Sequence, residues 1–432
     1  MTEAVVVAMS GGVDSSVAAC LLKEAGYQVI GMTLKTWPKE LCDTVPKTQT
    51  CCSTQDIEDA RAVAAQLGIP FYVVEAADAF KSTVMDYFVE SYADGLTPNP
   101  CVVCNRQIKS GILLEKAEAL GARWLATGHY ARVEWDPSQK RHRIRQAVDL
   151  KKDQSYVLFQ LTQQQLARMI FPLGDKTKAQ VREVALKAGL KVADKPESME
   201  LCFIPDGDTK GFLRQRIPES FIPGEIIDRS GRILGTHQGI AAYTIGQRKG
   251  LGLAHPRPLY VLGLDRATNR VIVGEEEELA AVSCEVEDLF WCAIPGLDGP
   301  REGLVKVRYR SGKLPARFVP AGSRVRVEFK DPTPGGVSPG QAAVFYEEEI
   351  VLGGGFIAKS DSAVTPLDPL QAWLAQAGLP KTVLEANGDQ LVLKLPPASR
   401  SRLLSDTALR EKTVAQARSL GFSRISLDLT WE

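Results

Sequence analysis

Two cysteines with the spacing CxxC, Cys101 and Cys104, lie in the stretch NPCVVCN, directly before a basic segment. Thiols at this spacing suit a zinc site, a redox pair, an iron–sulfur ligand set or a nucleophile that handles sulfur. A third thiol, Cys202, lies in the polar, turn-rich stretch SMELCFIPDGD. The residue types alone leave these kinds of chemistry open.

A second group of residues that could do chemistry is the string AMSGGVDSS, from Ala8 to Ser16. It lies where a predicted buried strand turns into a predicted amphipathic helix, so its glycines would let backbone N–H groups approach a phosphate. Asp14 would repel a phosphate unless Mg²⁺ or a capping role accounts for it. The ATPase pattern GxxxxGK[ST] does not occur there, so the string predicts a phosphate loop of another kind.

The elements that must position these groups alternate between strands and helices. Apolar runs predict strands at residues 4–10, 27–37, 70–76 and 123–133, and helical periodicity predicts helices at 13–26, 57–68 and 108–121. A long loop before residue 108 would carry the CxxC pair. The alternation predicts an α/β catalytic domain over residues 1–207, with a mainly parallel sheet and a helical insertion at 160–190.

The pattern changes after about residue 207. Short strands separated by Asp, Gly and Asn turns predict a small β-rich central domain over residues 208–279 and an antiparallel β-barrel over residues 280–360. Residues 363–432 mix helical and strand patterns and predict a separate α+β appendage. We expect this appendage to dock a partner or to stabilise the chain.

The composition is that of an ordinary soluble globular protein, with 24% charged and 44% hydrophobic residues. A formal net charge of zero argues against bulk electrostatic binding of a polyanion, but local basic runs at 140–145 and 306–317 could contact nucleic acid. No apolar run is long enough to span a membrane, and the amino terminus does not resemble a signal peptide. We therefore expect a cytoplasmic protein, with no membrane partner, that is a monomer when free.

In a reducing compartment the nine cysteines should mostly be free thiols or ligands. Cys20, Cys284 and Cys292 have no chemical context and should be structural. The cluster of Cys42, Cys51 and Cys52 could form a second metal site or could consist of incidental thiols in a loop.

The string SGGVDSS resembles the pyrophosphate loop of the N-type ATP pyrophosphatase superfamily, also called the PP-loop superfamily. Further strings extend the resemblance from about residue 4 to about residue 358, and they are TPNPCVVCN, DLKKDQSYVLF, SMELCFIPDGD, ATGHYAR and YTIGQRKGLGL. Together they resemble the bacterial and organellar tRNA-specific 2-thiouridylases. That family implies ATP-dependent 2-thiolation of the tRNA wobble uridine, in which the uracil C2 oxygen is adenylated before sulfur transfer, and ATP is converted to AMP and pyrophosphate.

The resemblance also implies roles for individual residues. Cys104 would be the nucleophile and Cys202 the persulfide carrier. ATP, with Mg²⁺, would lie on Ala8, Met9, Ser10, Gly11, Gly12, Val13, Asp14, Ser15, Leu34 and Gly128. The tRNA would contact Asn99, Pro100, Cys101, His129, Lys152, Asp153, Gln154, Arg308, Tyr309 and Gln341. Arg308 and Tyr309 offer a guanidinium and a stacking ring to an unstacked base. A sulfur-donor protein is the second implied partner.

One position departs from the family pattern, because the place of Cys101 is commonly an aspartate there. The extra thiol creates a pocket with three cysteines, Cys101, Cys104 and Cys202, which resembles the [4Fe–4S] site of other tRNA-thiolating relatives. Three thiolates would also suit zinc, with His129 as a conceivable fourth ligand. In the first mechanism Cys202 carries a persulfide that Cys104 resolves; in the second the three thiols hold a cluster.

Two other functions compete with this one. A PP-loop synthetase that amidates or ligates small molecules would explain SGGVDSS, but not the cysteines, the KKDQSY string or the barrel. A non-catalytic RNA-binding sulfur carrier would be expected to have a damaged phosphate loop or a missing cysteine, and the sequence has neither.

Overall fold

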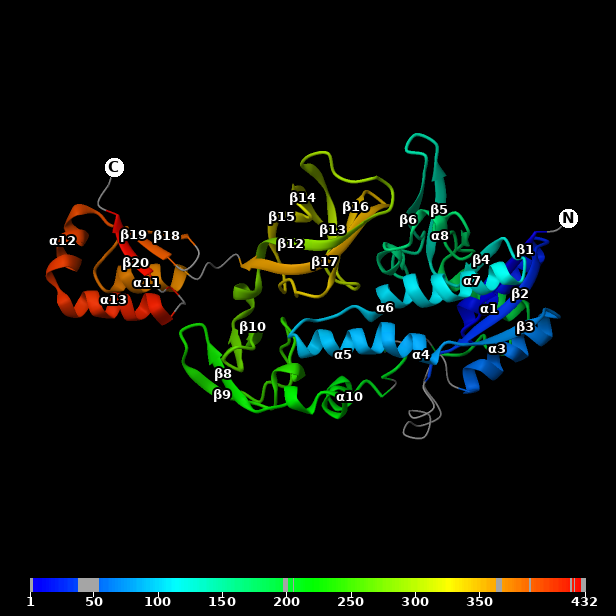
Figure 1. The fold of residues 1–432 in the computed structure, drawn as a ribbon, viewed down its shortest axis with the longest axis horizontal. Helices are drawn as coiled ribbons and strands as arrows, with labels where there is room; N and C mark the ends of the chain where they lie inside the picture. The colour runs from blue at the N-terminus through cyan, green and yellow to red at the C-terminus, as the bar shows by residue number, and fades with distance from the viewer. Residues whose placement is uncertain are drawn as a thin grey trace. The chain divides into compact units, whose positions relative to one another are not determined.

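The computed structural model describes residues 3–37, 54–196, 201–204, 206–362, 367–387, 390–419, 422 and 424–428. The chain divides into two compact units. Figure 1 labels its helices and strands. Unit 1 consists of Met1–Ser220, Cys284–Lys330 and Ser338–Lys359, and unit 2 of Phe221–Ser283, Asp331–Val337 and Ser360–Glu432. Cys42, Cys51 and Cys52 lie outside the described residues.

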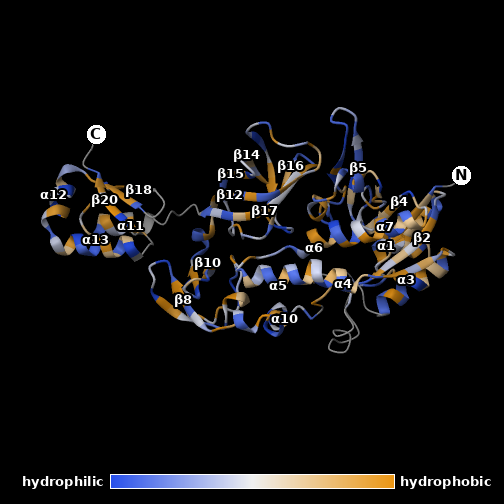
Figure 2. Cartoon of the chain, viewed as in Figure 1, coloured by the Kyte–Doolittle hydropathy of each residue, from blue (hydrophilic) through white to orange (hydrophobic). Residues whose placement is uncertain are grey.

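Unit 1 contains the predicted parallel sheet, with the strand order β3-β2-β1-β4-β7. Its strands are β1 (Ala4–Ala8), β2 (Gln28–Lys35), β3 (Phe71–Glu75), β4 (Trp124–Thr127) and β7 (Met169–Ile170). The apolar run of β1 is buried at the centre of the sheet. Figure 2 shows hydrophobic residues (orange) gathered in the region around β2, β4 and α1. Since β2 and β4 lie on opposite sides of β1, a crevice is expected beyond the carboxyl ends of β1 and β4, as in other open α/β sheets.

Helices α1 (Val13–Glu24), α3 (Thr54–Leu67) and α9 (Lys178–Lys187) contribute to the core that covers this sheet. The α/β architecture predicted from the sequence is therefore confirmed. The helical insertion predicted at 160–190 is only partly helical, because a short helix α8 (Gln163–Leu166) and strand β7 precede α9.

Two long helices replace the long loop expected before residue 108. The first consists of α4 (Ala77–Phe80), the π-helical segment η1 (Lys81–Met85) and α5 (Asp86–Ala93). The second, which we call the cysteine helix, consists of α6 (Pro100–Val103), the π-helical segment η2 (Cys104–Ile112) and α7 (Leu113–Ala119). Pro100 occupies the first helical turn, where its missing N–H has no cost. The CxxC pair is thus helical, and the loop expectation was wrong.

The strand predicted at 123–133 is two strands in different sheets. β4 ends at Thr127, and β5 (Ala131–Asp136) leaves the parallel sheet to pair with β6 (Arg141–Gln146). Gly128 lies in the break between them. An alternating apolar pattern does not say which sheet a strand joins, so the sequence could not reveal the break.

The predicted antiparallel barrel is present and has six strands. They are β12 (Ala281–Trp291), β13 (Arg301–Lys306), β14 (Leu314–Ala321), β15 (Arg324–Thr333), β16 (Ala342–Glu347) and β17 (Ile350–Ser362). Pairing of β12 with β17 closes the barrel, and β6 adds to β17 with Ile350 opposite Arg145. The β5–β6 hairpin therefore joins the catalytic domain to the barrel sheet. The 3₁₀ turn η3 (Ser155–Leu158) and helix α10 (Thr209–Arg216) complete unit 1, followed by the turn η4 (Pro218–Ser220).

Unit 2 contains two further sheets. The first has the order β10-β11-β8-β9, from β8 (Gly224–Asp228), β9 (Ile233–His237), β10 (Tyr260–Asp265) and β11 (Arg270–Gly274), with short turns η5 (Ile240–Ala242) and η6 (Glu276–Leu279). The second belongs to the appendage, with β18 (Val383–Asn387), β19 (Gln390–Lys394), β20 (Arg424–Asp428) and helices α11 (Leu367–Gln376), α12 (Pro397–Ser405) and α13 (Thr407–Ser419). No helix in the described part of the chain is long and apolar enough to cross a membrane.

The appendage has a hydrophobic core of its own, whose buried residues all lie between Leu370 and Phe422. We predict that a chain ending at residue 362 keeps the thermal unfolding midpoint of unit 1, because that core belongs to the appendage alone. Differential scanning calorimetry of the full and shortened chains measures this. A clearly lower midpoint for unit 1 in the shortened chain would contradict it.

Candidate active site

The phosphate loop, Ala8 to Ser16, is organised by its own hydroxyl groups. The Ser10 N–H donates to Ser15 Oγ at 3.1 Å, and the Ser15 hydroxyl donates to the Gly12 carbonyl at 3.2 Å. Gly12 is the N-cap residue of α1 and is extended, and no side chain in the described structure caps the first turn there. The N–H groups at the start of α1 can therefore donate hydrogen bonds to an anion. The positive end of the helix dipole favours the same ligand.

Two glycines allow close packing around this loop. Gly11 has φ of +71°, and a Cβ there would lie 2.2 Å from the Asp56 carbonyl oxygen. A Cβ on Gly128 would lie 2.7 Å from the Ser15 backbone nitrogen. Gly128 thus brings the end of β4 directly against the start of α1, at the crevice expected from the strand order. Met9 and Val13 of the loop and Leu34 of β2 are buried, whereas Ser10 is exposed.

The charge of Asp14 is balanced by two groups that the sequence analysis did not identify. Lys178 Nζ lies 2.7 and 2.9 Å from the two Asp14 carboxylate oxygens, and the Tyr130 hydroxyl donates to the same carboxylate at 2.8 Å. The Lys178 side chain is only 12% exposed. Asp14 therefore needs neither Mg²⁺ nor a capping role to account for its place beside the phosphate loop.

Lys195 is a second cation against the loop that the sequence analysis missed. Its Nζ donates to the Gly11 carbonyl at 3.1 Å and pairs with Asp56 at 2.6 Å and with Asp59 at 2.5 Å. These contacts tie α3 to the phosphate loop. Lys178 and Lys195 lie more than 160 residues from the loop in the sequence, and no local motif marks them.

On the cysteine helix, Cys101 is exposed and Cys104 is partly buried. Two residues between them, Val102 and Val103, are buried and anchor this turn. The Cys104 N–H bonds to the carbonyls of Pro100 and Cys101, which makes the turn helical. Side chains three residues apart on a helix lie on the same side, so both thiols belong to one face of the cysteine helix.

The third thiol, Cys202, is partly buried in a short turn whose next residue is well anchored. The Phe203 ring packs with the rings of Phe80, Phe88 and Phe212, at centroid distances of 5.9, 5.2 and 5.5 Å. The aromatic side chains of the helix over residues 77–93 therefore hold the Cys202 turn. Within the described residues, no group of three or more His, Cys, Asp or Glu side chains is arranged to hold a metal ion.

His129 is buried rather than exposed to a ligand. Its Nδ1 lies 2.7 Å from the Thr127 hydroxyl, and its ring meets the Phe171 ring edge-on. Burial, with a smaller contribution from Lys109 on the cysteine helix, lowers the pKa of His129 to about 3. The imidazole is therefore neutral at physiological pH, and it is positioned as a packing group beside Gly128.

The three cysteines expected to be structural are all buried. Burial raises the pKa of Cys20 to about 11, with Glu24 adding to the shift, and burial raises the pKa of Cys292 to about 12. These thiols are poor nucleophiles at neutral pH because so little thiolate forms.

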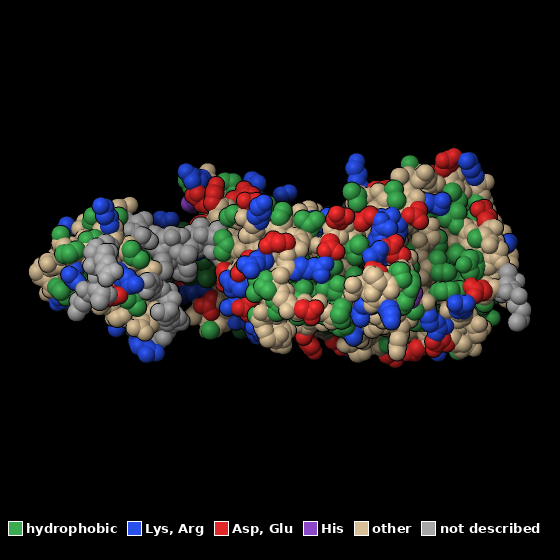
Figure 3. Space-filling model, turned by 90° about the horizontal axis from the view of Figure 1, so that it is seen from above, with side chains coloured by type: hydrophobic (Ala, Val, Ile, Leu, Met, Phe, Trp, Pro, Cys, Tyr) green, Lys and Arg blue, Asp and Glu red, His purple; other side chains and the backbone are tan. Residues whose placement is uncertain are grey.

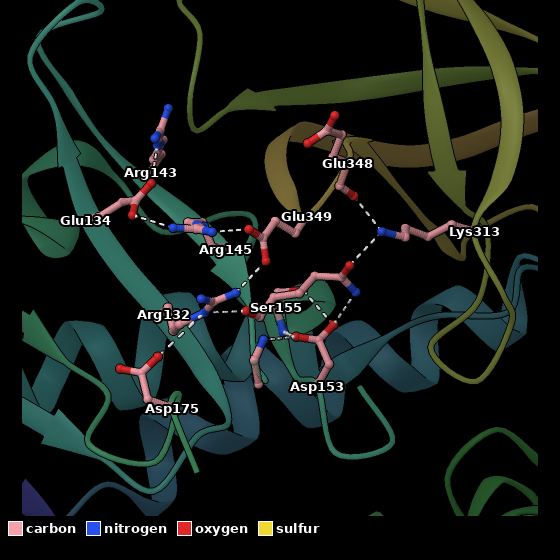
Figure 4. Close-up of polar contacts among 12 residues, drawn as sticks. Arg132, Glu134, Arg143, Arg145, Asp153, Ser155, Asp175, Lys313, Glu348 and Glu349 are labelled. Atoms are coloured by element: carbon pink, nitrogen blue, oxygen red, sulfur yellow. Dashed lines mark hydrogen bonds and ion pairs between the residues drawn. The ribbon is translucent and has the colours of Figure 1, made fainter. Parts of the chain in front are cut away.

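Asp153 is an internal hydrogen-bond acceptor. Its carboxylate accepts bonds from Gln146 Nε2 at 2.9 Å, the Ser155 hydroxyl at 2.8 Å and the Ala147 N–H at 3.0 Å, and the side chain is buried (Figure 4). Lys313 of the barrel donates to Gln146 Oε1 at 2.6 Å, which links the barrel to this acceptor. Asp153 therefore shapes the turn that carries Lys152 and Gln154.

The arginines of the basic run at 140–145 have partners within the protein. Arg143 pairs with Glu134 and Asp136. Arg145 pairs with Glu134 and with Glu349 of the barrel (Figure 4). Arg141 donates to the Trp291 and Cys292 carbonyls at 2.9 and 3.0 Å. This run joins the hairpin to the barrel.

Gln341, predicted to contact tRNA, bonds to the segment before the cysteine helix. Its Nε2 donates to the Thr97 carbonyl at 3.0 Å and the Pro98 carbonyl at 3.2 Å, and the Thr97 N–H donates to the Pro339 carbonyl at 2.8 Å. The barrel turn around Gln341 therefore holds the residues that lead into Asn99 and Pro100.

Tyr309 and Arg308 follow β13 on the same barrel. The Tyr309 side chain remains 39% exposed, and burial, Asp153 and Cys101 together raise the pKa of its hydroxyl. Cys101 therefore contributes to the electrostatic surroundings of Tyr309, although about two hundred residues separate the two in the sequence.

Comparison with known proteins agrees with this arrangement. Three family models match consecutive parts of the chain, described as tRNA methyl transferase HUP domain (residues 3–206), tRNA methyl transferase PRC-barrel domain (210–275) and Aminomethyltransferase beta-barrel domain (282–357). The tRNA-specific 2-thiouridylase MnmA of Desulfitobacterium hafniense is 50% identical over 364 residues, which are 82% of this chain and 97% of that protein. The protein of the same name from Heliobacterium modesticaldum is 49% identical, over 83% of this chain and 94% of its own length.

The chain belongs to the tRNA-specific 2-thiouridylase family.

Every candidate site residue of this thiouridylase lies inside the first or third matched range. The descriptions of two of the matching family models mention methyl transfer. The curated relatives, however, are named as thiouridylases, and they are about 50% identical to this chain along nearly their whole length. Among solved structures, a 4-thiouridine synthetase–RNA complex with bound ATP aligns at 18% identity with a TM-score of 0.30, over 50% of this chain and 51% of that one. A likeness at that level supports no inference. The appendage lies beyond all three matched ranges.

The anchoring of the Cys202 turn can be tested by Phe203→Ala. Removing the buried ring should lower the free energy of unfolding of the thiouridylase by about 3–5 kcal/mol and should make Cys202 react faster with an alkylating agent, because the turn loses its anchor. Urea unfolding and mass spectrometry of alkylated peptides measure the two effects. Phe203→Leu, which keeps most of the volume, is the control, with a cost below about 1.5 kcal/mol. An unchanged alkylation rate in Phe203→Ala would show that the ring does not hold the turn.

Proposed function

We propose that this chain catalyses ATP-dependent 2-thiolation of the wobble uridine of tRNA. The single observation that carries the proposal is the identity of about 50% to relatives named tRNA-specific 2-thiouridylase, over nearly their whole length. The geometry is consistent with it, because unit 1 contains an uncapped phosphate loop, a CxxC helix and a barrel that contacts the segment leading into that helix.

The phosphate loop is proposed to bind ATP, with the phosphates at the amino terminus of α1 and with Leu34 and Gly128 lining the site. In the reaction the uracil C2 oxygen attacks the α-phosphorus, the bond to the β-phosphate breaks, and pyrophosphate leaves. Mg²⁺ is proposed to enter with the ATP phosphates, because the Asp14 carboxylate is already engaged by Lys178 and Tyr130. Lys178 lies where it could also compensate phosphate charge.

Adenylation makes the C2 oxygen a good leaving group, as part of AMP. We propose that Cys202 carries a persulfide delivered by a donor protein, and that its terminal sulfur attacks C2 and displaces AMP. The Cys104 thiolate then breaks the bond between the transferred sulfur and Cys202 Sγ, leaving a Cys104–Cys202 disulfide that a cellular thiol reduces. A persulfide suits this step because it is more acidic than a thiol.

We propose that some residues contact the tRNA directly and that others hold those residues in place. Asn99, Pro100 and Cys101 would face the uracil, and Lys152, Gln154, Arg308 and Tyr309 would contact the surrounding RNA. His129, Asp153 and Gln341 have internal partners and would act by holding these groups in place. Reaching the wobble base requires flipping it out of its stack, at a cost of about a few kcal/mol.

The persulfide mechanism is tested on protein purified without oxygen. We expect no stoichiometric iron or acid-labile sulfide, retained thiolation in Cys101→Asp, and loss of thiolation in Cys104→Ser and Cys202→Ser. Cys284→Ala, which alters a buried thiol, is the control and should stay active. About four irons per chain, lost in Cys101→Asp together with thiolation, would instead establish a [4Fe–4S] cluster on Cys101, Cys104 and Cys202.

Assays of pyrophosphate release and tRNA binding on the same protein distinguish thiolation from the two competing functions. We expect pyrophosphate release from ATP to be stimulated by unmodified tRNA. Stimulation by free amino acids instead would favour a small-molecule synthetase, and tRNA binding without any pyrophosphate release would favour a sulfur carrier.

The role of Gln341 can be tested by Gln341→Met, which keeps the length of the side chain but removes both donors. We predict a roughly three- to tenfold lower kcat for thiolation, with the Kd for tRNA unchanged, because the lost bonds position the cysteine helix. Gln139→Met, at an exposed position of the β5–β6 turn, is the control. A raised Kd with an unchanged kcat would show that Gln341 contacts the tRNA directly.

A further inference from the structure

Lys306, the last residue of β13, is a lysine whose side chain is largely buried. Its side chain is 9% exposed, and its Nζ lies 5.6 Å from the centre of the Tyr156 ring and 5.8 Å from that of Tyr309. Within the part of the chain that the structure describes, Nζ has these two rings as neighbours but forms no hydrogen bond or close ion pair.

Such a position is costly for the folded protein. A largely buried ammonium group without a paired carboxylate loses part of its hydration, which two aromatic faces restore only in part. Burial lowers the pKa of Lys306, and the nearby Lys313 lowers it further, while Asp153 acts in the opposite direction. The Asp153 carboxylate, however, already accepts bonds from Gln146, Ala147 and Ser155.

The surroundings of Lys306 include residues to which the family resemblance assigns contact with tRNA. Tyr309, whose ring neighbours Nζ, is one of them and is partly exposed. Tyr156, the other ring, donates its hydroxyl to the Ala342 carbonyl at 2.8 Å, next to Gln341 and the segment that it holds. Lys306 therefore lies close to the place where the barrel contacts the segment that leads into the cysteine helix.

We propose that Lys306 binds a backbone phosphate of the RNA adjacent to the flipped uridine, while Tyr309 stacks on a base. The inference rests on the proposed function and extends it to a residue that the sequence analysis did not identify. A phosphate is the fitting ligand because a compact ammonium acts as a point charge, and a buried cation gains most from a full negative charge. The ATP phosphates have a separate site, at α1.

The salt dependence of tRNA binding tests this assignment. A protein that neutralises one phosphate fewer loses about 0.7–0.9 from the slope of log K against log salt. We expect Lys306→Met to show this loss of slope and a roughly tenfold weaker affinity at low salt. Lys359→Met, which removes a barrel lysine paired with Glu285 at 3.2 Å, is the matched control and should keep the slope. Tyr309→Leu should weaken binding without changing the slope.

Thermal unfolding of each variant shows whether it is folded, and Lys306→Gln provides a second reading if Lys306→Met is not. An unchanged slope in a folded Lys306 variant would overturn the phosphate assignment, even if the thiolation rate fell. Failure of the unaltered chain to bind tRNA would instead overturn the proposed function. The two failures are thus distinguishable.

Discussion

The antiparallel pairing of β6 with β17 is the constraint on which the candidate site depends. It places Ile144 opposite Val351 and Arg145 opposite Ile350, and so joins a hairpin of the catalytic domain to the closed barrel. Glu349, between Arg132 and Arg145 in Figure 4, reinforces the junction. Because the hairpin begins three residues after Gly128, this pairing orients the barrel relative to the phosphate loop.

That junction explains how distant groups come together. Gln341 of the barrel reaches the carbonyls of Thr97 and Pro98, more than two hundred residues away in the sequence. Cys101 likewise contributes to the electrostatic surroundings of Tyr309. The thiols themselves are carried by different elements. Cys101 and Cys104 share a helical face, whereas Cys202 belongs to a turn anchored through Phe203.

Many of the charged side chains form ion pairs with nearby groups of the same protein. Lys and Arg side chains are interspersed with Asp and Glu on the face drawn in Figure 3, in keeping with a net charge of zero. The arginines of β6 serve the hairpin and barrel, and Lys178 and Lys195 serve the phosphate loop. Recognition of an RNA by such a surface would depend on a few placed cations rather than on a broad positive field.

The sequence by itself carried the family resemblance and determined the strongly periodic elements. The strings around Gly11, Cys104 and Cys202 are part of that resemblance. The elements β1, α1, β2, α3 and β3 follow from local patterns, because local hydrophobic period decides local structure. Only the tertiary structure decided that residues 123–133 divide between two sheets, that residues 77–93 form a helix with its aromatic side chains against Phe203, and that Lys178 neutralises Asp14. These outcomes depend on contacts between residues far apart in the chain, and such contacts leave no periodic signal in the sequence.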